Sequence, residues 1–264
     1  MTDLIRECAL QWPGFLKVCA SDASSGTVWE GDGVGAAWAN TPFSICNGTY
    51  LTSPVNDAGD MERRLGMAAE FAAGADLPWI FYICKDWIPP ELYPDFEAAA
   101  TRAGLTLIIQ MTGMVATELR PPRRPAPALE IEPIQTEAQR LEATDLQAYA
   151  YSFPVDLCRT PTQAGALWGK TPQFAYIGYA DGMPASTATT LVIDGVLYVA
   201  LVATHPQAQR RGYAEAVMRH SLAEASRATG LSRTVLHASQ AGYPIYAAMG
   251  YQPTGAVAGF GPPH

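Results

Sequence analysis

The sequence has little positive charge for its length. Its 264 residues include 17 Lys and Arg against 25 Asp and Glu, which gives a net charge of −8. Because nucleic-acid binding depends on clustered Lys and Arg side chains, we expect no nucleic-acid partner. Most of the negative excess lies in residues 1–120, where it could attract a cationic amine, although such charge more often forms solvated surface.

Long apolar runs and a basic, apolar leader segment are also missing. No stretch approaches the roughly 18 apolar residues of a membrane helix, so we expect a cytoplasmic protein with no membrane partner. The cysteines are few, scattered and without a Cys-x-x-Cys pair, which predicts neither a disulfide framework nor a metal site. We interpret them as small buried apolar residues: Cys8, Cys19, Cys46, Cys84 and Cys158.

Proline is concentrated at one place, the stretch 121–127, which contains four prolines and two arginines. Prolines remove backbone donors and fix an extended chain, so this stretch predicts a linker over residues 121–128. A chain of this length is expected to hold two domains. We therefore predict one domain over residues 1–120 and a second over 129–264.

The second predicted domain has the clearest pattern. A short strand over 129–134 and a helix over 137–150 precede three strand-like runs, 174–180, 184–193 and 196–204. Asp181-Gly182 and Asp194-Gly195 separate these runs, and Asp-Gly predicts tight hairpins because the turn needs positive φ. The run 196–204 is apolar on both faces, which predicts a central strand covered on both sides.

After this strand the chain turns and enters a predicted helix that begins near Tyr213 and ends at Gly230. A strand over 234–238, a short helix over 243–249 and a last strand from Tyr251 follow. The first domain repeats part of this order, with a helix over 60–73, a strand over 79–84, a helix over 91–103 and a strand over 105–111. Internal duplication is therefore a hypothesis. The glycine cluster 31–35 is interpreted as a flexible loop.

The loop 209–214 connects the central strand to a helix. A helix start presents unpaired N–H groups and partial positive charge, which suits an anion. Gly212 and Ala214 would let a diphosphate approach the backbone, and Arg210 and Arg211 add charge. The corresponding stretch of the first domain, residues 55–60, contains acidic side chains and no cation.

These features resemble the GCN5-related N-acetyltransferase (GNAT) family. Its cofactor signature, Arg/Gln-x-x-Gly-x-Gly/Ala after an apolar strand, matches residues 209–214 behind 202–206, and residues 236–251 add to the match. The resemblance implies the GNAT fold, an α/β (α+β) fold with a mixed, mostly antiparallel sheet flanked by helices. The order of elements further suggests a tandem GNAT protein whose N-terminal domain is degenerate.

The resemblance also implies a site for acetyl-CoA between the strands 196–204 and 234–238. Main-chain groups around Thr204 would pair with the pantetheine arm, and the loop amides would hold the diphosphate. Ser239 stands where many members carry an asparagine. The implied cofactor-binding residues are Val202, Ala203, Thr204, Gln209, Arg210, Arg211, Gly212, Tyr213, Ala214 and Ser239.

Two residues are candidates for catalysis. Tyr246 matches the family's tyrosine near the thioester sulfur, where a phenol can protonate a departing thiolate; its alternative role is packing of the last helix. The central strand lacks the glutamate that serves as base in many members. His237 is the candidate base, although a lone strand histidine more often only packs.

The sequence thus predicts an enzyme that moves an acetyl group from acetyl-CoA to a primary amine of a small molecule or peptide by direct attack. Two alternatives are an acyl-CoA-binding sensor, or user of a longer acyl chain, and a non-catalytic interaction module. The candidate walls of the acceptor site are residues 149–154, 47–50 and 79–87. The oligomeric state, monomer or homodimer, is left open.

Overall fold

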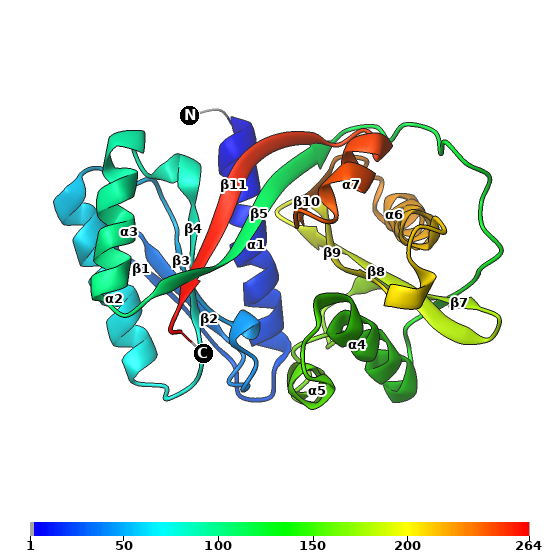
Figure 1. The fold of residues 1–264 in the computed structure, drawn as a ribbon, viewed down its shortest axis with the longest axis horizontal. Coiled ribbons are helices and arrows are strands. Elements are labelled where there is room, and N and C mark those ends of the chain that lie inside the picture. Colours follow the sequence, from blue (N-terminus) through cyan, green and yellow to red (C-terminus); the bar gives the residue numbers. More distant parts are fainter. Residues whose placement is uncertain (1–2, 264) are drawn as a thin grey trace.

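The computed structural model describes residues 3–263, so the outermost residues of the two predicted domains, 1–2 and 264, lie outside it. The strands form one 11-stranded sheet in the order β1-β2-β3-β4-β11-β5-β10-β9-β8-β7-β6 (Figure 1). The strands are β1 (Thr27–Gly31), β2 (Val34–Trp38), β3 (Asn47–Leu51), β4 (Ile80–Cys84), β5 (Thr106–Ala116), β6 (Glu130–Pro133), β7 (Gln173–Ala180), β8 (Met183–Ile193), β9 (Val196–Thr204), β10 (Thr234–Ala238) and β11 (Gln252–Gly261).

The helices are α1 (Asp3–Asp22), α2 (Ala58–Ala73), α3 (Tyr93–Arg102), α4 (Glu137–Tyr151), α5 (Val155–Gln163), α6 (Tyr213–Thr229) and α7 (Tyr243–Met249). Short 3-10 turns are η1 (Ser44–Cys46), η2 (Lys85–Trp87), η3 (Pro90–Leu92) and η4 (Pro206–Ala208). Among residues 3–263, no helix is both long and apolar enough to span a membrane. All five cysteines are buried, as predicted, and free.

The predicted meander of the C-terminal half is confirmed. β7, β8 and β9 pair antiparallel, and both Asp-Gly turns adopt positive φ, at 52° and 75° for the first pair and 49° and 78° for the second. α6 ends at Gly230, whose φ of 74° gives the left-handed cap that glycine favours. β9 lies between β8 and β10, inside the sheet as its two apolar faces predicted.

In the N-terminal half, α2, β4, α3 and β5 confirm the predicted order of helix, strand, helix and strand. The interpretation of residues 31–35 as a flexible loop is wrong. Gly31 ends β1, Gly35 lies in β2, and Asp32-Gly33 is the hairpin turn between them, with φ of 50° and 86°. This turn therefore has the same Asp-Gly chemistry as the two turns of the C-terminal meander.

The two halves exchange strands at the centre of the sheet. β5, from the N-terminal half, lies between β10 and β11, and β11, from the C-terminal end, lies between β4 and β5. In Figure 1 these two long strands cross the middle of the molecule side by side. The proline-rich stretch then runs as an exposed segment without helix or strand from β5 to the edge strand β6. The halves therefore share one hydrogen-bonded sheet.

Helices cover both faces of the sheet. In the N-terminal half, α2 and α3 pack on one face and α1 on the other. In the C-terminal half, α6 and α7 cover one face, while α1, α4 and α5 lie on the other. α1 is tied to the C-terminal half by ion pairing of Glu7 with Arg233 at 2.6 Å and by Asp22, which accepts from Thr171. It thus bridges the halves.

Candidate active site

The strands β9 and β10 separate along their length. They pair in parallel at only three positions, ending at Val199 with Leu236. β9 then carries a bulge: Ala200 pairs with Thr189 and Ala203 with Thr187, and Leu201 has a φ of 54°. β10 meanwhile stays paired with β5 through Ala238. Because a bulge bends its strand, the end of β9 turns away from β10 and an opening forms between them.

A cavity of about 350 Å³ occupies this opening and extends beneath α1. It lies where two halves of the chain meet, since residues of α1, η1 and β5 line it together with residues of α4, β9 and β10. Four of the predicted site residues line it: Val202, His237, Ser239 and Tyr246. The predicted site residues of β9, β10 and the α7 region are therefore brought together at one place.

The walls of the cavity differ in part from the sequence-based expectation. From the stretch 149–154, Tyr151 and Phe153 line the cavity. The stretches 47–50 and 79–87 do not line it, because β3 and β4 point their side chains into the cores between the sheet and its helices. The aromatic side chains of Trp12, Phe15 and Phe43 take their place. Their positions depend on long-range packing, which no local sequence signal indicates.

The loop before α6 lies at the outer end of β9. Gln209, Arg210 and Arg211 are exposed, and Gly212 caps the helix with a φ of 84°. A Cβ atom built on Gly212 has no described atom within 4 Å. Within residues 3–263 the N–H groups of Gly212, Tyr213 and Ala214 donate to no protein acceptor. The helix start is therefore open to an external anion.

The side chains of most other predicted cofactor residues are buried or already hydrogen-bonded within the protein. Ala203 and Tyr213 are buried, and the hydroxyl of Thr204 is hydrogen-bonded to that of Ser186 at 2.9 Å. The carbonyl oxygen of Val202 accepts from the Tyr151 hydroxyl at 3.3 Å. The Ser239 hydroxyl oxygen accepts from the N–H of Gly242 at 3.2 Å, which caps the start of α7.

Tyr246 is 9% exposed and faces the cavity from α7. Burial raises the pKa of its phenol above the ordinary value, and the nearby Tyr151 and Tyr251 hydroxyls act in the same direction. Burial removes water that would stabilise the phenolate. Tyr246 therefore holds its proton throughout the physiological pH range.

His237 faces the cavity from the α1 side of the sheet. Its Nδ1 atom lies 2.9 Å from the Tyr198 hydroxyl and its Nε2 atom 3.5 Å from the Cys8 sulfur. Burial lowers the pKa of the imidazole to about 4 and raises the pKa of the Cys8 thiol to about 11. Both groups are therefore neutral at pH 7, and the pair is not a thiolate–imidazolium pair.

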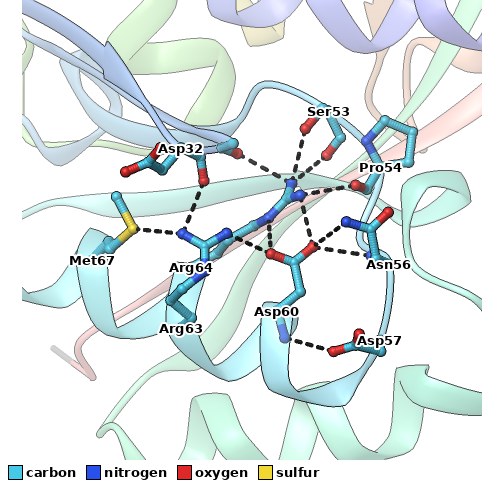
Figure 2. Close-up of polar contacts among 10 residues, drawn as sticks. Asp32, Ser53, Pro54, Asn56, Asp57, Asp60, Arg63, Arg64 and Met67 are labelled. Atoms are coloured by element: carbon cyan, nitrogen blue, oxygen red, sulfur yellow. Dashed lines mark hydrogen bonds and ion pairs between the residues drawn. The ribbon is translucent and has the colours of Figure 1, made fainter.

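The N-terminal half has a corresponding helix start, at α2, and its own side chains fill it (Figure 2). Asp57 accepts from the backbone N–H of Asp60 at 2.9 Å, and Asp60 accepts from that of Asn56 at 3.0 Å. Arg64, almost fully buried, pairs with Asp60 at 2.7 Å and donates to the Ser53 and Pro54 carbonyls. The Asp57 carboxylate therefore accepts one N–H group of this helix start, and the carboxylates of Asp57 and Asp60 place negative charge where an external anion would bind.

Comparison with known proteins identifies a family domain in the C-terminal half of the chain. The family model "Acetyltransferase (GNAT) domain" matches residues 188–254, which include the bulge, the loop and α7. None of the curated proteins compared with the chain matches it in sequence.

Solved structures match over more of the chain. A GCN5-related N-acetyltransferase from Kribbella flavida has a TM-score of 0.72 at 17% identity, covering 100% of this chain and 97% of its own. Another from Sphaerobacter thermophilus has a TM-score of 0.57 at 13% identity, covering 86% and 76%. A tandem GNAT protein from the clavulanic acid biosynthesis pathway has a TM-score of 0.54 at 12% identity, covering 86% and 77%.

The resemblance and the fold class predicted from the sequence are thus confirmed. The chain contains a GNAT acetyltransferase domain in its C-terminal half and has the GNAT fold.

Proposed function

We propose that the protein transfers an acetyl group from acetyl-CoA to a primary amine of a small molecule. The observation that carries the proposal is the opening between β9 and β10, which holds a cavity beside Tyr246, together with the unfilled helix start at Gly212 that follows β9 in the chain. An elongated ligand with an anionic diphosphate at one end and an apolar thioester arm at the other fits both features.

Different residues of the chain would bind different parts of this ligand. The amides of Gly212 to Ala214 and the side chains of Arg210 and Arg211 would hold the diphosphate, with Gln209 beside them. Main-chain groups of the bulged end of β9, Val202 to Thr204, would hold the pantetheine arm. Ser239 still has its hydroxyl proton to donate at the same opening.

In the reaction, acetyl-CoA supplies the acyl group in activated form, as a thioester. Tyr246 would donate its phenolic proton to the departing sulfur. The burial that keeps Tyr246 protonated also disfavours a free thiolate in the same opening. His237 is unprotonated at pH 7 and would accept a hydrogen bond, but a direct role as base requires it to release Tyr198 or Cys8.

A combined binding and activity experiment tests this proposal. Acetyl-CoA at a hundred times its Kd should stabilise the protein by about 2.7 kcal/mol, seen as a rise in Tm. An amine library should then release thiol with at least one acceptor, and Tyr246→Phe should lower kcat while leaving the Tm shift unchanged. No Tm shift with any CoA ester would refute cofactor binding, and full activity of Tyr246→Phe would remove this residue from the mechanism.

One observation favours a second candidate, an acyl-CoA-binding protein without turnover. No carboxylate lines the part of the cavity that the structure describes, so no strong base faces the reacting centre. A Tm shift without thiol release from any amine would support this candidate over the enzyme.

We also infer that the N-terminal half is a degenerate GNAT domain that has lost cofactor binding and supplies walls to the catalytic half. Its filled helix start supports this inference.

The free cysteines accord with a reducing compartment such as the cytoplasm, which cell fractionation would test. The oligomeric state stays open between monomer and homodimer, and sedimentation would decide it.

A further inference from the structure

The cavity beside Tyr246 has an unusual electrostatic character for an amine site. Among the described residues that line it, none is Asp, Glu, Lys or Arg. A cationic ammonium placed there would lose its water without gaining a counter-charge, which is unfavourable because a buried charge without a partner loses its solvation. The walls therefore discriminate against a protonated acceptor.

The cavity also lacks the means to deprotonate an ammonium. An alkylamine has a pKa near that of lysine, ~10.4, so almost all of it is protonated at pH 7. The titratable groups that face His237 are Cys8 and Tyr198, and burial raises the pKa of both. His237 itself, with a pKa of about 4, is far too weak a base to remove such a proton.

The shape and composition of the deep part of the cavity indicate what it accepts instead. On the α1 side of the sheet, Trp12, Phe15 and Phe43 face the space next to Tyr198 and His237. Trp12 and Phe15 pack 5.7 Å apart at a tilt of 45°, so the wall presents both ring faces and ring edges. Such a wall favours a flat aromatic ring.

We propose that the acceptor is an aromatic primary amine, neutral at pH 7, whose ring packs against Trp12, Phe15 and Phe43. This inference rests on the proposed acetyltransferase function. Delocalisation of the lone pair into the ring keeps such an amine unprotonated, so attack needs no prior deprotonation. The C–N bond forms as the C–S bond breaks. The sulfur takes the proton of Tyr246, and the tyrosine regains a proton from the acylated nitrogen.

Two isomeric aminoindanes provide a matched test. The aromatic isomer, 5-aminoindane, carries its amino group on the aromatic ring and is neutral at pH 7. The aliphatic isomer, 2-aminoindane, has the same atoms and nearly the same shape but is cationic. We expect the aromatic isomer to have a kcat/KM about tenfold or more above that measured with the aliphatic isomer at pH 7.

Between pH 6 and 9, the kcat/KM of the aromatic isomer should stay flat, and that of the aliphatic isomer should rise about tenfold per pH unit. Calorimetry at pH 7 should detect binding of the aromatic isomer alone.

A variant sharpens the test. Gln110 lines the cavity and is exposed, so Gln110→Glu adds a carboxylate without changing the side-chain size. It should raise the kcat/KM for the aliphatic isomer, relative to the aromatic one, by roughly 2–5-fold, the effect of a partly solvated charge pair. Gln252→Glu adds the same charge at an exposed position of β11 outside the cavity lining and should leave the ratio unchanged.

The outcomes distinguish failure of the aromatic-acceptor proposal from failure of the proposed acetyltransferase function. If the aliphatic isomer is acetylated as well as or better than the aromatic one at pH 7, or if the ratio is unchanged in Gln110→Glu, the aromatic acceptor is overturned and the acetyltransferase stays intact. A larger Tm shift with octanoyl-CoA than with acetyl-CoA would overturn it too, because the cavity would then hold an acyl chain. Absence of any acetyl-CoA binding would instead remove the proposed function.

Discussion

The starts of α2 and α6 occupy the same place in the order of elements of the two halves. They differ in which groups cap the first backbone N–H groups of the helix. At α2, Asp57 accepts from the N–H of Asp60 and Asp60 accepts from that of Asn56, while a backbone bond from Val55 to Trp87 at 2.8 Å ties the loop after β3 to η2. At α6, within the residues that the structure describes, Gly212 stands at the cap position and no side chain accepts from the first N–H groups. A helix start therefore binds an external anion only where the chain has not supplied one of its own.

The comparison also explains how the halves divide their roles. The N-terminal half uses its charged groups for stability and gives its helix α1 and strand β5 to the shared cavity. The C-terminal half leaves its loop exposed and its cavity open. The following substitutions test this division.

The largest expected effect is on stability at α2. Arg64→Ala removes the buried cation beside Asp60 and its bonds to the Ser53 and Pro54 carbonyl oxygens, which should lower the free energy of unfolding by about 3–5 kcal/mol. Arg63→Ala is the matched control, since Arg63 is half-exposed and its loss should cost about 1 kcal/mol or less. Urea unfolding measures both. Equal effects would mean that the buried network does not stabilise the N-terminal half.

The next effect concerns the anion site. Gly212→Glu places an anion at the free N–H groups and should abolish the Tm shift that acetyl-CoA produces. Gly230→Glu is the control at the other end of α6, because Gly230 has a similar positive φ, 74° against 84°, and equally open surroundings. The control should suffer the same backbone strain and retain the shift. Loss of the shift in both variants would point to strain alone.

A smaller effect is expected from the exposed arginines of the loop. Arg210→Ala and Arg211→Ala should each weaken acetyl-CoA binding by roughly 2–5-fold and reduce its dependence on salt. Neither should change the urea midpoint. Arg123→Ala, in the exposed linker, removes the same charge away from the loop and should leave binding unchanged. Titrations at low and high salt distinguish these results.

A last effect is the acid dependence of α2. Burial alone would raise the pKa of Asp60, but hydrogen bonds from Arg64, the Asn56 backbone and Arg63 outweigh it and lower the pKa from 3.8 to about 2. Because the folded-state pKa is depressed, the stabilisation is complete above pH 3.8 and is lost as the pH falls through about 2. Urea midpoints between pH 5 and 2 should therefore fall less steeply in Asp60→Asn than in the native protein.

Local chemistry made much of the C-terminal half predictable. Asp-Gly pairs fixed the hairpins of the meander, Gly230 fixed the end of α6, and the cofactor signature located the loop. The same Asp-Gly signal at Asp32-Gly33 was misread, because β2 beside it contains Gly35, Ala36 and Ala37 where β-branched residues would mark a strand.

Other features depend on contacts that sequence patterns do not carry. The exchange of β5 and β11 joins segments more than a hundred residues apart, and no local propensity indicates it. α1 was not predicted, since Pro13 and Gly14 in its middle suggest a break. The cavity walls Trp12 and Phe15 were missed with it, whereas Tyr246 and His237 were found because their own segments carry the family pattern.

The number of acetyl-CoA molecules bound per chain tests the central comparison most directly. Calorimetric titration of the full chain should give one site, located at α6, because α2 already holds its own carboxylates. Two sites per chain would contradict the closed start of α2, and the absence of binding would contradict the open start of α6.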